Sequence, residues 1–468
     1  MDRAQIEAYF DDPKRQEQLV QAISRLVRIR SVREDAQPGI PFGPGPAAAL
    51  AEALALCGEL GLSAQNHENY VGTADLNEKE TRLHILGHLD VVGEGTGWTV
   101  TEPYTPKLVD GMLYGRGADD DKGPVVCALM AMQAVRELGV ELNYNVRMIL
   151  GTDEESGSGD IAYYYAREPY APYTFSPDAE FPVINIEKGS YKPAFTKTWA
   201  PETATPRVTA LQGGFRINVL PPEAECVVTG LSAAAARPYC DRSAAETGAV
   251  YELSEAGDDL RILCHGKGAH ASLPEEGNNA ITALLHLLCA LPLAKVGSTA
   301  ALHALNALFP HGDCAGRALG IAQSDAVSGA LTLAFSLLEV NEHGLSGRFD
   351  SRFPLCATEE NCKLAAEAAF AKFGFTVEGG MDAPHHTDAD SPFVQTLLRC
   401  YEAYTGRTGE GLAIGGGTYV HDIPGGVAFG CGMPGFNGNM HGADEHTCIQ
   451  DLLTACKIFT QVIIDVCA

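Results

Sequence analysis

The chain has 468 residues, of which 46% are hydrophobic and 20% are charged, so it can bury the cores of about two to three globular domains. Its 33 basic and 60 acidic side chains give a formal net charge of −27, which argues against nucleic-acid binding, because that binding depends on Lys and Arg. The 14 cysteines include no CxxC pair and are too sparse for a disulfide scaffold, as is typical of thiols in a reducing compartment.

Neither the N-terminal segment nor the most apolar stretch indicates export or membrane insertion. Residues 1–20 are charged throughout and contain no apolar signal core. Residues 280–294 form the most apolar run, but they include His286 and Pro292 and are too few to cross a bilayer. We therefore expect a cytoplasmic protein that does not bind membranes.

Helices and strands alternate along the first part of the chain. The spacing of apolar residues and the positions of Pro and Gly predict, in chain order, helices at 14–30 and 46–60, a buried strand at 82–92, a helix at 123–139, and strands at 143–155 and 181–189. Strands that alternate with helices imply parallel βα units. In such sheets, ligands bind beyond the carboxyl ends of the strands.

The pattern of predicted helices and strands changes in the middle of the chain. From about 188 to 383, short strands such as 224–231 and 260–272 are mixed with helices such as 278–290. After residue 384, helices and glycine-rich strand ends return, up to an amphipathic helix near 447–466. The predicted fold class is α/β, with one mostly parallel-sheet domain (1–187 and 384–468) that has helices on both faces and is interrupted by a large α+β insertion (188–383).

Acidic residues and histidines cluster where we expect the strands of the sheet to end. They are His88 and Asp90 in "GHLDVV", Asp119 to Asp121 in "GADDDKG", Asp153 to Glu155 in "GTDEES", Asp178 in "SPDAE" and, much later, His441 in "NMHGADEH". Any one of these groups alone is most often a solvated loop. Converging carboxylates raise each other's pKa values unless a cation offsets their repulsion, so the set together predicts a metal site.

The residue types and spacings narrow the kind of metal site. Oxygen and imidazole ligands without a thiolate suit Zn²⁺, Mn²⁺ or Co²⁺, and a shared carboxylate can hold two such ions about 3.5–4 Å apart. Asp90 lies two residues after His88, on the same side of an extended backbone, so it can accept the second N–H of a metal-bound imidazole. Glu154 and Glu155 are adjacent and point apart, so one can bind metal while the other acts as a general base.

Nine motifs occur in the order found in a known group of enzymes. They are "GHLDVV", "YGRGADDDKGP", "GTDEESGS", "SPDAEFPVINIEKG", "INVLPPEAE", "GKGAHASLPEEGNNA", "FDSRFP", "GGGTY" and "MPGFNGNMHGADE". From about residue 14 to its end, the chain resembles the co-catalytic-metal peptidases that include carnosinases, carboxypeptidase G, acetylornithine deacetylase and succinyl-diaminopimelate desuccinylase. Within that group it is most similar to the bacterial PepV type of dipeptidase.

The resemblance implies a role for each candidate residue. Two divalent ions are expected, Zn²⁺ first with Mn²⁺ or Co²⁺ as alternatives, held by His88 and Asp178 on one side, by Glu155 and His441 on the other, and bridged by Asp120. Glu154 is then the general base and Asp90 the residue that orients His88. The insertion would be a lid over the catalytic domain. Its residue His270 would stabilise the oxyanion, and its residues Asn218 and Arg352 would hold the substrate. Gly415 and Gly416, in the second catalytic segment, would offer backbone groups to the peptide.

The activity implied is that of a dipeptidase, in which a metal-bridging water attacks the peptide bond of a small peptide substrate. A hinge near residues 188 and 383 would let the lid close. The lid is long for the family and resembles the arrangement of monomeric relatives, so we expect a monomer. Two alternatives remain: a deacylase of N-acyl amino acids with the same metal centre, and a catalytically silent metal-binding homologue.

Overall fold

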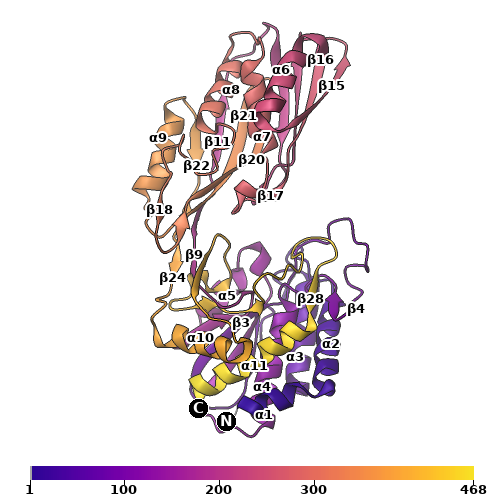
Figure 1. Cartoon of the computed structure of the whole chain (residues 1–468), viewed down its shortest axis with the longest axis vertical. Coiled ribbons are helices and arrows are strands. Elements are labelled where there is room, and N and C mark those ends of the chain that lie inside the picture. The colour runs from indigo at the N-terminus through magenta and orange to yellow at the C-terminus, as the bar shows by residue number, and fades with distance from the viewer. Residues whose placement is uncertain (1–2) are drawn as a thin grey trace. The chain divides into compact units, whose positions relative to one another are not determined.

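The structure, a computed structural model, describes residues 3–468, and the chain divides into two compact units. The first unit consists of Met1–Ile186, His386–Leu412 and Gly417–Ala468, and therefore contains both ends of the chain. The second unit consists of Glu187–His385 and Ala413–Gly416. Figure 1 traces the chain through both units, from indigo at the N-terminus to yellow at the C-terminus.

A twisted mixed sheet forms the centre of the first unit. Its strands, in spatial order, are β1 (Ser63–His67), β2 (Val71–Asp75), β6 (Asn145–Gly151), β3 (Thr81–His88), β7 (Tyr173–Ser176), β26 (Val427–Ala428) and β9 (Val183–Glu187). The four strands from β6 to β26 run parallel, whereas β1, β2 and β9 run antiparallel to their neighbours. The predicted parallel arrangement therefore holds for the middle of the sheet and not for its flanks.

Helices cover both faces of this sheet. The helices of the first unit are α1 (Arg3–Phe10), α2 (Pro13–Val27), α3 (Pro44–Glu59), α4 (Lys122–Glu137), α5 (Gly159–Tyr165), α10 (Pro392–Thr405) and α11 (Ile449–Cys467) (Figure 1). Along β3, Leu83 and Ile85 join the larger core with α2, α4 and α11, whereas Leu86 joins Ile161 and Tyr164 of α5. This alternation follows from the two-residue period of a strand.

Helix α4 is buried on nearly all of its sides, because other helices cover the face that turns away from the sheet. Each residue from Val125 to Val135 is buried, and α4 contacts α2, α11, β3 and β6. A helix that is apolar all round is expected in such a position. The segment just before α4 is consequently held against a rigid core, at the carboxyl end of the neighbouring β3.

The second unit is an antiparallel sheet with helices. Its main strands, in spatial order, are β15 (Val250–Ala256), β16 (Asp259–His265), β14 (Glu223–Thr229), β12 (Arg207–Gly213), β20 (Thr332–Asn341), β21 (Gly344–Phe353), β10 (Gly189–Tyr191) and β23 (Met381–Asp382), with β11 (Ala194–Thr198) between β21 and β22 (Thr376–Glu378). Its helices are α6 (Ala233–Thr247), α7 (Ala280–Ala290), α8 (Gly297–Leu308) and α9 (Ala365–Ala371). Phenylalanines at 195, 309, 335, 349 and 370 pack together in its core.

Short strand pairs complete the description. β13 (Val219–Leu220) pairs with β17 (Ala269–His270), β18 (Ser324–Asp325) with β19 (Gly329–Ala330), and β8 (Ala179–Glu180) with β27 (Cys431–Gly432), and β5 (Met112–Tyr114) lies between β4 (Lys107–Val109) and β28 (His446–Cys448). β24 (His385–His386) and β25 (Gly411–Ile414) fall where the chain passes from one unit to the other.

The elements predicted from the sequence are confirmed. The predicted helices correspond to α2, α3, α4, α7 and α11, and the predicted strands to β3, β6, β9, β14 and β16. The strand predicted to reach residue 155 ends at Gly151, where the chain turns into a short 3₁₀ helix, Glu154–Ser156. Among residues 3–468 all 14 cysteines are free thiols, and no helix combines the length and apolarity that crossing a membrane requires.

Candidate metal centre

The predicted ligands of the first unit converge at the carboxyl edge of the parallel strands. His88 is the last residue of β3, the turn with Glu154 and Glu155 follows β6, and Asp178 follows β7. Because β3 pairs in parallel with both β6 and β7, these three strand ends meet at one edge. The fold therefore brings together side chains that are up to 90 residues apart.

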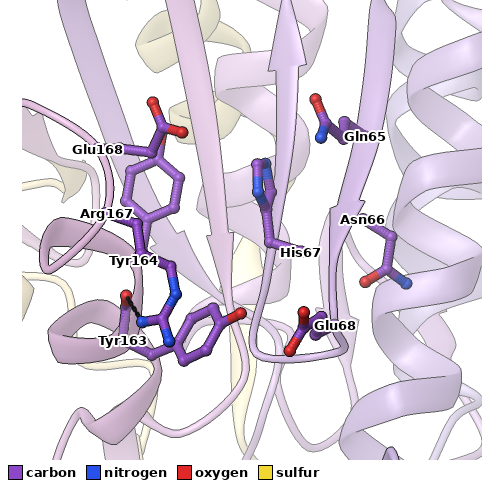
Figure 2. Close-up of a pocket in the computed structure, with 8 residues that line it drawn as sticks. All are labelled: Gln65, Asn66, His67, Glu68, Tyr163, Tyr164, Arg167 and Glu168. Carbon is purple, nitrogen blue, oxygen red and sulfur yellow. Dashed lines mark hydrogen bonds between the residues drawn. The ribbon is translucent and has the colours of Figure 1, made fainter.

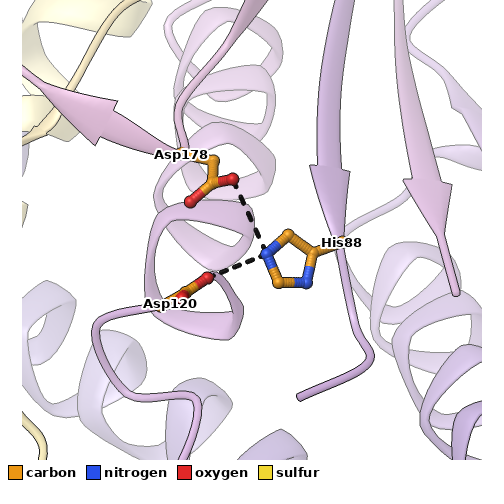
Figure 3. Close-up of side chains that lie close together, drawn as sticks. All are labelled: His88, Asp120 and Asp178. Carbon is orange, nitrogen blue, oxygen red and sulfur yellow. Dashed lines mark hydrogen bonds and ion pairs between the residues drawn. The ribbon is translucent and has the colours of Figure 1, made fainter. Parts of the chain in front are cut away.

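One group of possible ligand atoms consists of His88, Asp120 and Asp178 (Figure 3). His88 Nε2 lies 2.8 Å from Asp120 Oδ1 and 3.7 Å from Asp178 Oδ2. The other ring nitrogen, Nδ1, lies 3.0 Å from the backbone carbonyl of Asp90, to which its N–H must donate. This hydrogen bond points Nε2 at the two carboxylates, as a metal ligand requires.

A second group consists of Asp120, Glu155 and His441. His441 Nε2 lies 2.9 Å from Asp120 Oδ2 and 3.1 Å from Glu155 Oε1. The two oxygens of Asp120 thus face different histidines, one in each group. Within each group the candidate ligand atoms all lie within 4.8 Å of one another.

The donor atoms fit divalent cations. An ion in a tetrahedral site with ligand distances of about 2.1 Å holds its ligand atoms about 3.4 Å apart, and the four separations above, 2.8, 3.7, 2.9 and 3.1 Å, bracket that value. All the donors are carboxylate oxygens or imidazole nitrogens, which suit Zn²⁺, Mn²⁺ or Co²⁺. Asp120 has a free oxygen for each of two ions.

The electrostatics of the cluster also favour a cation. Burial raises the pKa of Asp178 well above its ordinary value, and the charges of Asp120 and Asp121 raise it further. Burial opposes the charge of His441, but hydrogen bonds to Asp120 and Glu155 raise the pKa of the imidazole to about 10. Bound protons on these carboxyl and imidazole groups therefore reduce the repulsion between the carboxylates. Divalent metal ions can replace the protons and reduce the same repulsion.

Asp90 organises the turn that carries the two glutamates. Its buried carboxylate accepts the backbone N–H of Glu154 on Oδ1 and that of Glu155 on Oδ2, both at 3.1 Å. We expected this carboxylate to accept the second N–H of His88, but it lies 3.5 Å from Nδ1, farther than the Asp90 carbonyl. The reason is that both carboxylate oxygens turn toward the glutamate backbone.

Glu154 lies in this cluster but in neither group of candidate ligands. Burial raises the pKa of its carboxyl well above the ordinary value, the charge of His88 lowers it, and the charges of Glu155 and Asp120 raise it again. A carboxyl with a raised pKa beside a metal site is suited to exchange protons with a bound substrate or water.

The three consecutive aspartates have different partners. Asp120 contacts both histidines, whereas Asp121 accepts the backbone N–H of His88 on Oδ2 at 2.9 Å and so fixes the end of β3. Burial raises the pKa of Asp119 to about 8, and the charges of Glu445 and Asp120 contribute to this. The sequence analysis gave a metal-binding role to Asp120 alone among the three, and the contact of Asp121 was not predicted.

The remaining predicted residues lie in the second unit and are connected within it. His270 pairs with Val219 in the ladder of β13 and β17, next to Asn218, whose carbonyl accepts the N–H of Ala271 at 2.9 Å. Ser272 Oγ lies 2.6 Å from His270 Nδ1. A Cβ atom built on Gly415 would lie 2.7 Å from the Cβ of Ser272, which brings the glycine segment against the His270 turn.

Arg352 is held beside the same glycine segment, which also contains Gly416. Its Nε and Nη2 contact the two oxygens of Asp350 at 2.7 and 3.0 Å, and its Nη1 donates to the carbonyl of Gly415 at 2.8 Å. A guanidinium has five N–H groups, so these contacts leave one N–H on each terminal nitrogen for a ligand. That edge can bind a carboxylate with two parallel hydrogen bonds.

Several residues at the metal centre were missed by the sequence analysis. Tyr419, from the "GGGTY" motif, donates to Asp160 Oδ2 at 2.5 Å, and the same oxygen accepts the N–H of Asp153 at 3.0 Å. Arg116 and Glu445 form a buried ion pair within the motifs that contain Asp120 and His441. Tyr419, Arg116 and Glu445 belong to the recognised motifs, which indicated that they matter to the site. The motifs did not indicate which residue each of them contacts.

A hollow in the first unit, separate from the metal cluster, contains none of the predicted residues. It has a volume of about 190 Å³ and lies between the β1–β2 hairpin and residues 163–168 (Figure 2). The guanidinium of Arg167 lies 3.6 Å from the centre of the Tyr163 ring and donates to the Tyr163 carbonyl at 2.8 Å. Its charged lining is thus largely occupied with itself, and the metal cluster remains the candidate site.

The chain matches the peptidase family M20/M25/M40 over residues 84–465, which include every candidate site residue. The chain therefore belongs to this family and is a metal-dependent peptidase, and its two groups of candidate metal ligands agree with this. The resemblance inferred from the nine motifs is confirmed.

Several relatives match nearly the whole chain. The chain is 33% identical over 457 residues to the "Putative dipeptidase YtjP" of Bacillus subtilis (strain 168), with 96% of this chain and 97% of that protein covered. It is 31% identical over 451 residues to the "Beta-Ala-Xaa dipeptidase" of Lactobacillus delbrueckii subsp. lactis, with 95% of each covered.

Solved structures share the fold. Human carnosine dipeptidase 1 matches with a TM-score of 0.60 at 17% identity, covering 99% of this chain and 98% of that one. The aminoacylhistidine dipeptidase from Vibrio alginolyticus matches with a TM-score of 0.57 at 14% identity, covering 96% of both chains. The predicted α/β fold with an inserted α+β unit is thereby confirmed.

Proposed function

We propose that the protein is a dipeptidase that uses two divalent metal ions to hydrolyse the peptide bond of dipeptides. The observation that carries the proposal is Asp120, whose oxygens lie 2.8 Å from His88 and 2.9 Å from His441. A carboxylate between two imidazoles, with a further carboxylate beside each, is the arrangement of a bridging ligand in a two-metal hydrolase.

Each ion would be held by three side chains of the first unit. His88, Asp178 and Asp120 would bind one ion, and Glu155, His441 and Asp120 the other, with Zn²⁺ as the first choice and Mn²⁺ or Co²⁺ as alternatives. Bound ions would lower the pKa of a water and polarise the carbonyl of the scissile bond. Asp90 would keep His88 and the two glutamates in position.

Glu154 would act as the general base. Its neighbour Glu155 belongs to a ligand group, whereas Glu154 does not, so its carboxylate is available for proton transfer. It would take a proton from the attacking water and deliver it to the leaving amine. A glutamate that binds no metal is suited to this position because its carboxylate can both accept and release a proton.

His270 would donate a hydrogen bond to the oxyanion that develops at the scissile carbonyl. The backbone N–H of Ser272 lies 3.3 Å from His270 Nδ1 and can only donate, so a neutral imidazole with this bond carries its proton on Nε2. That is the tautomer an oxyanion donor needs. Such a donor typically contributes about 3–4 kcal/mol to catalysis.

Substrate length would be set by Arg352. With Asp350 fixing the guanidinium, its remaining edge would bind the C-terminal carboxylate of the substrate, and Asn218, Gly415 and Gly416 would bind the peptide. A carboxylate required at fixed reach from the scissile bond allows a single residue on its C-terminal side, as in a dipeptide. The names of the two relatives, a putative dipeptidase and a Beta-Ala-Xaa dipeptidase, support the same substrate class.

A substrate panel tests the proposal. Protein loaded with Zn²⁺ or Mn²⁺ should hydrolyse dipeptides, including β-alanyl dipeptides, and should hardly act on dipeptide amides, which lack the carboxylate that Arg352 would bind. Asp120→Asn, which keeps the side-chain shape but removes the charge, is the matched inactive control. Faster hydrolysis of N-acyl amino acids would favour a deacylase, and no hydrolysis of any substrate would favour a silent homologue.

We also propose that the protein works as a monomer in the cytoplasm, with residues 188–383 acting as a lid over a catalytic domain formed by 1–187 and 384–468. The support for a monomer is the length of this insertion, which was the basis of the expectation from the sequence. Sedimentation of the metal-loaded protein at micromolar concentration should give the mass of one chain, and a stable dimer would contradict this.

A further inference from the structure

A buried ion pair joins two segments of the first unit that lie far apart in the sequence. Arg116 Nη1 lies 2.6 Å from Glu445 Oε2, and the two side chains are 1% and 0% exposed. Removing two charges from water is costly, and buried ion pairs are often no more stabilising than well-packed apolar residues. This pair therefore needs an explanation other than stability alone.

Glu445 holds the loop that carries Asp120. Its second oxygen, Oε1, accepts the backbone N–H groups of Gly117, Asp119 and Asp120 at 2.9, 3.0 and 3.2 Å. Three donors that converge on one carboxylate oxygen fix the course of this loop. The backbone of Asp120 is thus positioned by a charged residue that is distant in the sequence and belongs to neither ligand group.

Arg116 holds the loop that carries His441. Its second terminal nitrogen, Nη2, contacts the carbonyl oxygens of His441 at 3.3 Å and of Gly442 at 3.1 Å. The same nitrogen also lies 3.3 Å from the carbonyl oxygen of Gly93 and 3.4 Å from that of Glu94. His441 has a φ of 63°, in the left-handed region that few non-glycine residues adopt. Such a conformation persists only where the surroundings enforce it, and Arg116 supplies part of that enforcement.

The ion pair therefore links the backbones of two predicted ligands. Asp120 Oδ2 and His441 Nε2 lie 2.9 Å apart, and Glu155 completes their group. We propose that Arg116 and Glu445 are positioning residues that fix the spacing of Asp120 and His441 and thereby set the affinity of their group for a divalent cation. This inference rests on the proposed function, because it requires that a cation binds there.

The charges of the pair fit this role. The positive and negative charges cancel, so the pair orders both loops without changing the net negative charge that attracts a cation. An apolar pair of the same volume could fill the space, but it could not accept three N–H groups on one side and donate to two carbonyls on the other. The hydrogen bonds, and not the attraction between the charges, are what connect the loops.

Zinc binding to the full-length apoprotein tests the inference. The protein is stripped with a chelator, and Zn²⁺ alone is titrated against a competing chromophoric chelator for the wild type, Glu445→Gln and Arg116→Lys. Glu445→Gln keeps the size of the side chain but brings an amide N–H against either Arg116 or the three backbone donors. Arg116→Lys keeps the charge but cannot reach Glu445 and both carbonyls at once.

We expect each variant to bind one of its two Zn²⁺ ions about 10- to 100-fold more weakly than the wild type, as is typical when a residue that supports a ligand is changed. The control is Arg147→Lys, which disrupts a two-point ion pair with Asp75 in the same unit, with both contacts at 2.9 Å. It should lower stability but leave both zinc affinities unchanged.

Unchanged zinc affinity in Glu445→Gln and Arg116→Lys would overturn the inference. An equal weakening in Arg147→Lys would also overturn it, because the effect would then follow from general destabilisation. Wild-type protein that fails to bind two ions would instead reject the proposed function itself.

A second measurement uses only the wild type and so does not depend on the folding of the variants. Because binding and loop order are linked, Zn²⁺ should slow hydrogen exchange at the amides of Gly117, Asp119 and Asp120. Exchange of a peptide that spans these residues is compared with and without Zn²⁺ by mass spectrometry. Unchanged protection would show that the hydrogen bonds to Glu445 are independent of the metal, and this outcome would also overturn the inference.

Discussion

Replacement of Glu154 by Gln separates proton transfer from metal binding. The substitution preserves the size of the side chain and leaves the backbone N–H of residue 154 free to donate to Asp90, so the turn that carries Glu155 should be retained. Glu154 belongs to neither ligand group, so the variant should still bind two ions per chain. What it loses is a group able to take up a proton.

The expected loss is large. General acid–base catalysis by a positioned side chain contributes about 100- to 10,000-fold, so kcat should fall by that factor, equivalent to about 3–5 kcal/mol. The assay measures kcat on a dipeptide for protein whose metal content has been counted by mass spectrometry. Glu155→Gln is the matched control, because the neighbouring change removes a predicted ligand and should reduce the metal content itself.

Two results would refute this reasoning. If fully metal-loaded Glu154→Gln kept more than about a tenth of the wild-type kcat, Glu154 would not be the base. If it lost an ion while Glu155→Gln kept both, the two glutamates would have exchanged roles.

Three further predictions concern single side chains. His270→Ala should lower kcat about 100- to 1,000-fold while both ions remain bound, and a loss of metal would mean that His270 is a ligand. Tyr419→Phe removes the donor to Asp160 and should cost about 1–3 kcal/mol in urea unfolding, whereas an unchanged midpoint would mean that this bond adds nothing. Burial and, to a smaller extent, the positive charge of Arg147 lower the pKa of His84 to about 3. Below pH 6.5 the folded chain therefore binds fewer protons than the unfolded chain. The free energy of unfolding consequently decreases as the pH is lowered. At pH 5 His84→Gln should avoid about 2 kcal/mol of that loss, and parallel curves for both proteins would contradict this.

The candidate ligands could be predicted from the sequence because of where they fall along the chain. His88 and Glu155 lie near the ends of two predicted apolar strands, and parallel strands end at a common edge, so the sequence pattern indicated that they lie close together. Asp178 follows β7, a four-residue strand that the sequence analysis did not predict. Asp120 and His441 do not follow such strands, and their assignment depended on the resemblance to the peptidase motifs.

The partners of these ligands could not be predicted in the same way. Arg116 and Glu445 are 329 residues apart, and neither a spacing nor a hydrophobic period relates them. The contact of Asp121 with the N–H of His88 depends on how the end of β3 meets the start of α4, which only the packed structure defines. The contact partner of a single polar side chain cannot be predicted from a sequence pattern, because it depends on which residues the fold brings close.

Two strands of the central sheet, β1 and β26, were missed for a related reason. β1 has the sequence "SAQNH" and is largely exposed, so it lacks the apolar alternation that marks a strand. β26 contains only Val427 and Ala428, too few residues to show any period. Both strands exist because a neighbouring strand offers hydrogen bonds, and not because of their own side-chain pattern.

The central claim is that Asp120 bridges two metal ions, and anomalous diffraction from crystals grown with Zn²⁺ tests it most directly. Data collected on both sides of the zinc absorption edge should show two peaks about 3.5–4 Å apart, one beside His88 and Asp178 and the other beside Glu155 and His441, with one oxygen of Asp120 on each. A single peak, or two peaks that Asp120 does not join, would contradict the account.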